Sequence, residues 1–523
     1  MLTRIARAAA LALCFATAQA AAQDLTVGLS TPITTLDPHF HNLSPNNAMV
    51  RHVFETLIRT DEAQRHLPGL AESWKALSDT EWEFKLRKGV KWHDGKEFDA
   101  EDVLATFKRV PNVPNSPASF AVFVRPIVDA RAVDRHTLRF KTSSPHPLLP
   151  SDMSSVLILP KAVAETAKTE DFNSGKAMVG TGPFRYVEYV SGDRVVLTRH
   201  DGYWGAKPHW GKVTFKMIPS APARVAALLA GDVQMIENVP TADIPKLKSD
   251  ARVALSSAVS NRLIYLHMDS GRDKNTPFVT TADGKPLEAN PFRDPRVRRA
   301  ISKMIDRDAI ASRIMEGQAV PAGQLLPDQF FGTSRRLKVD RYDPEGAKKL
   351  LAEAGYPNGF GVTLHAPNNR YINDAAIAQA VAQFMSRNGI PTKLETMPAN
   401  VFFSRGTKLE FSFLLAGWGA ESGDTSSPLR ALLGTFDAKA GMGSANRGRF
   451  SDVGLDAMIT TALTTIDDTK RGLMLAAASE KAIELMGLVP VHYEVSTWGT
   501  RKGLAYKARA DQYTLAYDVR PGK

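Results

Sequence analysis

One strand-helix-strand pattern in the second half of the chain restricts the possible folds more than any other feature. Residues 362–365 and 392–396 are extended, and residues 373–387 between them carry apolar side chains at helical spacing. Such a unit is right-handed and joins two parallel strands. Parallel sheets bind ligands beyond their strand ends, where the connecting loops converge. The pattern therefore predicts an α/β fold with binding residues in connections such as residues 368–371.

Other segments alternate between helical and extended patterns in the same way. A helical pattern covers residues 46–59, and a strand pattern covers residues 82–86. Three further helices are predicted by their caps, because Asp99, Asp294 and Asp343 each precede an amphipathic run. This alternation supports the α/β class for the whole chain.

The length of 523 residues allows two to four domains or lobes, at roughly 150 residues each. The pattern of residues 1–22 is typical of a signal peptide. Arg4 and Arg7 precede an apolar run, and the small residues Ala18 and Ala20 precede the expected cleavage site. We expect cleavage near residues 20–22; an ordinary N-terminal helix is the alternative. The leader predicts export to a bacterial periplasm. No later apolar run approaches roughly 20 residues, so we expect the exported chain to be soluble.

The composition excludes several kinds of chemistry. Cys14 is the only cysteine and lies in the predicted leader, which excludes disulfides, thiolate catalysis and cysteine-bound metal in the exported chain. The net charge of +11 arises from Lys and Arg interspersed with acidic residues, which argues against nucleic-acid binding. His39 and His41 could face one side of a strand and hold a metal. Because no third ligand is near them in sequence, surface or hydrogen-bonding histidines are the preferred interpretation.

No motif predicts an enzyme. The sequence has no GxSxG elbow, no phosphate-binding P-loop, no HExxH and no GxGxxG after a strand. We therefore expect no catalytic residue, no bound metal and no cofactor. A secreted hydrolase stays a remote alternative, which assays on ester and peptide substrates would test.

Several motifs, in order along the chain, resemble those of one family. They are PGLAESW (68–74), WEFKLRKGVKWHDG (82–95), DAEDV (99–103), GTGPF (180–184), YW (203–204), FRDPRVRRA (292–300) and IDR (305–307). Together they resemble the family 5 solute-binding proteins of ABC importers, which include oligopeptide-, dipeptide- and nickel-binding proteins. The resemblance extends from Leu36 to Val491, nearly the whole exported chain.

Most of these motif residues have structural roles by our interpretation. The tryptophans at 74, 82 and 92 are expected to pack in the first lobe, because they alternate with charged residues. Gly180, Gly182 and Pro183 suit a tight turn whose glycines permit positive φ. Asp294 and Asp306 suit helix caps. The motifs therefore indicate the fold and leave the ligand open.

The resemblance implies a two-lobed type II periplasmic-binding-protein fold with an extra subdomain inserted in the N-terminal lobe. Lobe I would comprise residues 24–266, with the inserted subdomain at about 60–179, and lobe II would comprise residues 267–487. Residues 488–523 would return to lobe I. Two extended segments, residues 262–268 and 488–495, would cross between the lobes as a hinge. Two crossings restrict motion to closure about one axis, which would trap a ligand.

The resemblance also implies ligand contacts from lobe I. In peptide-binding relatives, the stretch after LDPH pairs its backbone with the ligand backbone, which points to Asn42 and Ser44 here. Backbone pairing binds peptides regardless of their side chains. The alternative is a loop before a helix, stabilised by the same two side chains.

The segment AGWGAE (416–421) is the stronger candidate for ligand contact. It follows an apolar strand at 411–415 and resembles the segment of peptide binders whose tryptophan and aspartate hold the ligand. Trp418 and Gly419 would lie against the ligand, and Glu421 would pair with its ammonium. Glutamate replaces the usual aspartate, so the pocket would differ in shape. Arg370 could meet a ligand carboxylate, or could be a surface arginine.

These features predict a periplasmic substrate-binding protein that binds a short peptide between its lobes and catalyses no reaction. Its partners would be an ABC permease and ATPase at the inner membrane, and we expect a monomer. A non-peptide ligand such as a metal chelate, an opine or a sugar is the main alternative, because the 416–421 segment departs from the peptide pattern.

Overall fold

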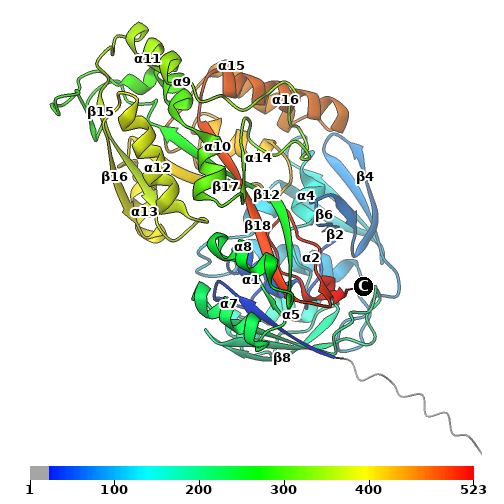
Figure 1. Ribbon diagram of the computed structural model, residues 1–523. Coiled ribbons are helices and arrows are strands. Elements are labelled where there is room, and N and C mark those ends of the chain that lie inside the picture. The colour runs from blue at the N-terminus through cyan, green and yellow to red at the C-terminus, as the bar shows by residue number, and fades with distance from the viewer. Residues whose placement is uncertain (1–22, 523) are drawn as a thin grey trace, which may run out of the picture.

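A computed structural model describes residues 23–522 and has a mixed α/β architecture (Figure 1). Its largest sheet contains 12 strands and extends through both halves of the molecule. In spatial order the strands are β13 (Val279–Thr280), β15 (Gly361–Pro367), β17 (Phe413–Gly419), β12 (Val253–Met268), β18 (Val489–Arg501), β11 (Met235–Ile236), β1 (Asp24–Leu29), β10 (Lys212–Met217), β9 (Arg194–Arg199) and β8 (Phe184–Val190), with β14 (Ala319–Pro321) beside β18 and β16 (Thr392–Met397) beside β15.

Strands β12 and β18 join the two halves, as Figure 1 shows. They are 16 and 13 residues long and pair with each other antiparallel. The pairing is interrupted between Val259 and Leu263, and from Arg262 onward β12 also pairs with β17. The extended conformation expected for residues 262–268 and 488–495 is therefore confirmed, and their action as a hinge stays a prediction.

The strand-helix-strand unit is present as predicted. Strand β15, helix α12 (Asp374–Arg387) and strand β16 follow one another, and the two strands are parallel. Gly389 has a φ of +98°, a conformation that favours glycine and lets the chain turn away from the helix.

A smaller sheet of four antiparallel strands packs against helix α2 (Ala100–Arg109). The expected cap is present, because Asp99 and Asp102 form a reciprocal capping box at the start of α2. Trp82 and Trp92 are buried in this core and Trp74 packs against it, which confirms their structural role. The strands of this sheet and of two two-stranded sheets are β4 (Ala71–Ser78), β5 (Glu81–Leu86), β6 (Ile127–Asp134), β7 (Thr137–Thr142), β2 (Ile58–Thr60), β3 (His66–Pro68), β19 (Leu504–Ala505) and β20 (Arg520–Pro521).

The predicted acidic caps in the second half are also present. Asp294 accepts a hydrogen bond from the backbone N–H of Arg296 (2.8 Å), Asp343 accepts one from Gly346 (2.9 Å), and Asp306 accepts one from Ala309 (2.9 Å). The remaining helices are α1 (Ser44–Val50), α3 (Ala121–Val124), α4 (Leu149–Met153), α5 (Lys161–Thr166), α6 (Thr169–Asn173), α7 (Ala221–Ala230), α8 (Ile244–Ser249), α9 (Pro295–Met304), α10 (Arg307–Ala309), α11 (Pro344–Glu353), α13 (Ala399–Thr407), α14 (Ser426–Pro428), α15 (Val453–Leu463) and α16 (Asp468–Glu484).

The helix predicted over residues 46–59 is wrong beyond its first turns. Helix α1 ends at Val50, and the chain becomes β2 at Ile58. The backbone carbonyl of His52 accepts a hydrogen bond from the N–H of Phe184 (3.0 Å), and that of Val53 accepts one from Gly182 (2.9 Å). A distant segment thus takes the carbonyl groups that a longer helix would use.

The same contact explains why glycine is needed at 180 and 182. Neither glycine adopts the positive φ that glycine permits. Instead, a Cβ at Gly182 would lie 2.7 Å from the Val53 carbonyl oxygen, and one at Gly180 would clash with the same atom. Close approach of two backbones therefore accounts for this motif.

Three main hydrophobic cores organise the described residues. One gathers side chains from Leu263 to Tyr493, one combines Leu25–Met235 with Trp498–Val519, and one lies between Leu57 and Ile158. The predicted lobe boundaries stay a prediction. Among residues 23–522, no helix has the length and apolar character of a membrane span. The predicted signal peptide lies outside the described residues.

Candidate ligand-binding site

One cavity between the two halves of the molecule is lined by all six residues that the sequence singled out. Its volume is about 270 Å³, and we call it the cleft cavity. Its walls are formed by Asn42, Leu43, Ser44, Asn261, Arg262, Tyr265, Arg370, Tyr371, Phe403, Gly417, Trp418, Gly419, Glu421, Ala445, Arg447 and Asp511. The predicted residues are thus brought together, and their contact with a ligand stays a proposal.

The lobe I wall comes from the chain just before and at the start of α1. The backbone N–H of Asn42 donates to the carbonyl of Ala118 (2.9 Å), and its side-chain oxygen accepts from Asn47 (2.8 Å). The backbone N–H and the side-chain oxygen of Asn42 thus both form hydrogen bonds within the protein. These bonds agree with the alternative interpretation, in which Asn42 stabilises a loop before a helix. Ser44 is the first residue of α1 and also lines the cavity.

The opposite wall includes the end of β17. We expected the strand to end at residue 415, but it extends to Gly419 because it pairs with residues 262–268 of β12. Trp418 is half-buried, packs against two hydrophobic clusters, and donates from Nε1 to the Ser427 hydroxyl (3.0 Å). A Cβ at Gly417 would lie 2.8 Å from Tyr371, and one at Gly419 would lie 3.1 Å from Arg262. These glycines therefore make room for protein side chains.

A buried ion pair lies beside the cavity. Arg262 Nε lies 3.3 Å from Glu494 Oε2, and their side chains are 12% and 3% exposed. Arg262 also donates to Gln512 (3.1 Å), and Glu494 accepts from the backbone N–H of Ile372 (3.1 Å). Burial raises the pKa of Glu494, while Arg262 opposes that shift. The Arg262 charge is thus balanced within the protein.

Glu421 and Arg370 carry charges that the described part of the protein does not pair. Both side chains are exposed to solvent, and neither forms an ion pair with another residue of 23–522. Enclosure by the surrounding protein raises the pKa of Glu421, and Arg262 and Arg51 oppose this effect. Enclosure also lowers the pKa of Arg370, helped by the neighbouring charge of Arg262. A zwitterionic ligand could pair with both groups.

Direct contacts cross between the two halves near this cavity. The side-chain amide of Gln64 donates to the Glu421 carbonyl (2.8 Å) and its oxygen accepts from Asn261 (2.9 Å). On the other side, the Asn373 amide donates to the Thr241 hydroxyl (2.9 Å). The cleft is thus bridged in this structure.

Several residues of the cavity were not predicted from the sequence, among them Arg262, Tyr265, Arg447 and Asp511. Arg262 and Tyr265 lie in the segment expected to be a hinge, and that role drew attention away from their side chains. Arg447 and Asp511 lie in irregular segments without a local motif. Only the fold brings these residues to Glu421 and Arg370.

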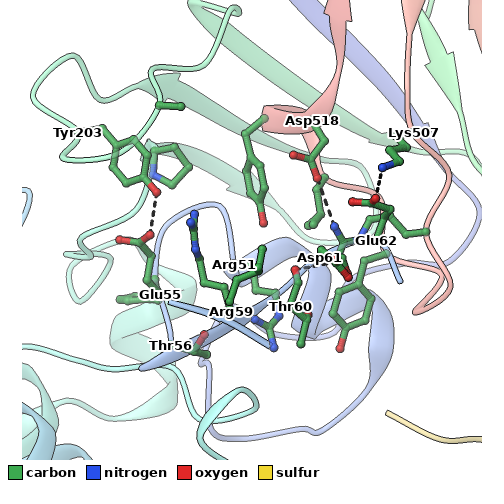
Figure 2. Close-up of a pocket in the computed structure, with 18 of the residues that line it drawn as sticks. Arg51, Glu55, Thr56, Arg59, Thr60, Asp61, Glu62, Tyr203, Lys507 and Asp518 are labelled. Carbon is green, nitrogen blue, oxygen red and sulfur yellow. Dashed lines mark hydrogen bonds and ion pairs between the residues drawn. The ribbon is translucent and has the colours of Figure 1, made fainter. Parts of the chain in front are cut away.

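A second cavity of about 340 Å³ lies within the first half of the molecule, and we call it the side cavity (Figure 2). Figure 2 shows the Tyr203 hydroxyl directed at Glu55 and, across the cavity, Lys507 beside Glu62. Glu55 accepts from Tyr203 (2.8 Å), Trp204 (2.7 Å) and Thr181 (2.9 Å). The other carboxylates are also paired: Asp61 with Arg65, Glu62 with Lys507 and Asp518 with Arg509.

The two histidines considered as metal ligands make other contacts. His39 is fully buried, with Nε2 2.7 Å from the Leu157 carbonyl and Nδ1 2.9 Å from Arg109. His41 Nδ1 lies 3.2 Å from the Thr34 hydroxyl. Within residues 23–522, no three His, Cys, Asp or Glu side chains are grouped as a metal site requires.

Comparison with known proteins identifies the family. The profile of the bacterial extracellular solute-binding proteins, family 5 (middle part), matches residues 66–440. The chain belongs to this family. It is 29% identical over 433 residues to the dipeptide-binding protein of Escherichia coli (strain K12), covering 77% of this chain and 76% of that protein.

Solved structures share the two-lobed fold of this solute-binding protein. The ABC transporter-associated periplasmic binding protein DppA from Helicobacter pylori, in complex with the peptide STSA, has a TM-score of 0.78 at 22% identity, covering 96% of this chain and 98% of that chain. NikZ from Campylobacter jejuni, in complex with Ni(L-His), has a TM-score of 0.77 at 20% identity, covering 95% and 99%. The predicted fold class is therefore confirmed. Family 5 proteins are periplasmic or extracellular binding components of ABC importers, and the relatives named here are binding proteins rather than enzymes.

Proposed function

We propose that this solute-binding protein binds a short peptide in the cleft cavity and delivers it to an ABC permease and ATPase at the inner membrane. The observation that carries the proposal is the pair of unbalanced charges, Glu421 and Arg370, on the walls of one enclosed cavity. A peptide has an ammonium for the carboxylate and a carboxylate for the guanidinium. The names of the Escherichia coli relative and of the Helicobacter pylori complex support the same ligand class.

The cavity size favours a short ligand. A volume of about 270 Å³ is slightly below the roughly 300–1,000 Å³ range of small-molecule sites. Two strands, β12 and β18, connect the halves, so opening about them would admit a ligand and closing would enclose it. We expect a monomer, exported through the predicted signal peptide.

A metal chelate is the second candidate, because NikZ, which binds Ni(L-His), has the same fold. The cleft cavity has no histidine on its walls, yet a chelate can be held through the carboxylate of its own amino acid. Opines and sugars stay open for the same cavity.

Calorimetry with Ala-Ala and N-acetyl-Ala-Ala tests the proposal. Acetylation removes the ammonium and keeps the rest of the peptide, so we expect Ala-Ala to bind and the acetylated form to bind at least about a hundredfold more weakly. Mass spectrometry of the ligand released from purified protein identifies the natural compound. A released chelate, opine or sugar, with no binding of either peptide, would contradict the proposal.

A further inference from the structure

Among the charged groups of the cleft cavity that form no ion pair within the described protein, positive groups outnumber negative ones. Three guanidinium groups line it, from Arg262, Arg370 and Arg447. Arg262 pairs with Glu494, and the lining carboxylate of Asp511 pairs with Arg509. Within the described chain, Arg370 and Arg447 form no ion pair. Two cations therefore stand against the single free carboxylate of Glu421.

Arg447 is held in a defined place by the helix α13. Its guanidinium carbon lies 5.3 Å from the centre of the Phe403 ring, a cation–π distance. A Cβ at Gly406 would lie 3.1 Å from Arg447 Cδ, so the arginine stem passes close to the helix backbone. Its Nε is buried and has no hydrogen-bond partner in the described structure. A buried donor without a partner is costly, and a bound anion would relieve the cost.

Tyr265 adds a second donor beside Arg447. Its side chain is buried, with 1% of the residue exposed, yet it lines the cavity. Its hydroxyl makes no hydrogen bond to any residue of 23–522. Burial raises the pKa of Tyr265, so the hydroxyl keeps its proton at neutral pH, and the nearby Arg447 charge opposes the shift. The hydroxyl is thus an unused donor that faces the cavity.

These two groups lie away from the Glu421 end of the cavity. Arg262 pairs in register with Gly419, two residues before Glu421, whereas Tyr265 pairs with Ala416. Three residues along a strand span about 10 Å. This backbone separation of Arg262 and Tyr265 is similar to the length of a dipeptide or tripeptide. Such a ligand could have its ammonium at the Glu421 end and an anionic group at the Tyr265 end.

We propose that Arg447 and Tyr265 form a second anion subsite, which selects small peptides that carry an acidic side chain as well as the terminal carboxylate. The inference rests on the proposed function, since it assumes that Glu421 holds the ammonium. Arg370 and Arg447 then each bind one carboxylate, and Tyr265 donates a hydrogen bond to the second.

Calorimetry with two matched peptide pairs tests the subsite: Ala-Glu against Ala-Gln, and Glu-Ala against Gln-Ala. Each pair differs only in the side-chain charge. We expect at least one acidic peptide to bind about tenfold or more tightly than its amide partner. Arg447→Gln should remove that preference and leave the affinity for the amide peptide unchanged. Arg341→Gln, which removes an exposed arginine elsewhere in the same half of the chain, is the matched control and should change neither affinity.

The outcomes separate the two proposals. If the acidic and amide peptides bind equally well, or if Arg447→Gln weakens both equally, the subsite is wrong and the peptide proposal stands. If none of the four peptides binds, both proposals are wrong. A Tyr265→Phe variant, which keeps the ring and removes the hydroxyl, should reduce the acidic preference in part; an unchanged preference would exclude Tyr265 from the subsite.

Discussion

The cleft cavity and the side cavity are similar in volume, about 270 and 340 Å³, and both are rich in arginine and carboxylate groups. They differ in how their carboxylates are paired. In the side cavity each carboxylate has a partner within the protein, as Glu55 does with Tyr203, Trp204 and Thr181. In the cleft cavity Glu421, Arg370 and Arg447 have no ionic partner in the part of the chain described here.

This difference indicates different roles for the two cavities. Paired charges such as Lys507 with Glu62 connect the C-terminal segment to the first half of the chain. Unpaired charges at an enclosed surface add little to folding and are available to a ligand. A carboxylate without a partner therefore distinguishes the binding site better than cavity size does.

Removing a paired charge from the side cavity should have the largest effect on folding. Arg509 is 6% exposed at its side chain and also donates to the Asp61 carbonyl (3.2 Å). Arg509→Met leaves two carboxylates without their partner, so we expect the free energy of unfolding to fall by about 3–5 kcal/mol. Urea unfolding at neutral pH measures it. The matched change in the cleft cavity, Arg447→Gln, should cost much less, and an equal loss in both would remove the distinction between the cavities.

Removing the unpaired carboxylate of the cleft cavity should act on binding instead. Glu421→Gln keeps the side-chain shape and removes its charge, so we expect dipeptide affinity to fall by about 2–5 kcal/mol. Stability should barely change, because Glu421 forms no ion pair within residues 23–522. Calorimetry and urea unfolding measure the two quantities. Unchanged affinity would exclude Glu421 from the site and favour a ligand without an amine.

Trp418 should show an intermediate behaviour, because it belongs both to the cavity wall and to two hydrophobic clusters. We expect Trp418→Ala to reduce dipeptide affinity by about 2 kcal/mol. Because the ring is only half-buried, its removal should lower the free energy of unfolding by less than the roughly 3–5 kcal/mol expected for a fully buried tryptophan. Trp418 would be only a packing residue if Trp418→Ala lost as much stability as a core substitution while the folded molecules kept their dipeptide affinity.

The two strands that join the halves should give the smallest effect, through pH. His267 on β12 and His492 on β18 are buried with neither ring nitrogen hydrogen-bonded in the described structure. Burial lowers the pKa of each to about 3, below the ordinary 6.5. The unfolded chain then binds more protons below pH 6.5, so stability falls as pH decreases through that value. Between pH 7 and pH 5.5 each histidine should cost about 1 kcal/mol.

Urea unfolding at the two pH values measures this loss. His492→Leu should remove the contribution of one histidine, so the loss of stability between pH 7 and pH 5.5 should be smaller by about 1 kcal/mol. This difference is independent of any change in stability that the substitution causes at pH 7. An identical fall in the variant would show that other groups cause the pH dependence.

Local signals accounted for much of the fold but only part of the site. The caps at Asp99 and Asp294 were predictable because a cap depends on a few neighbouring residues. The end of α1 at Val50 was not, because it depends on hydrogen bonds to residues 182–184 far along the chain. Likewise, Glu421 and Arg370 were found through a motif and a loop position, whereas Arg447 reaches the cavity only through tertiary packing against α13.

A crystal structure of the protein with bound dipeptide tests the central claim most directly. The account predicts the peptide in the cleft cavity, with its ammonium within hydrogen-bond distance of the Glu421 carboxylate and its carboxylate on Arg370. A peptide bound in the side cavity, or one in the cleft cavity that contacts neither residue, would contradict it.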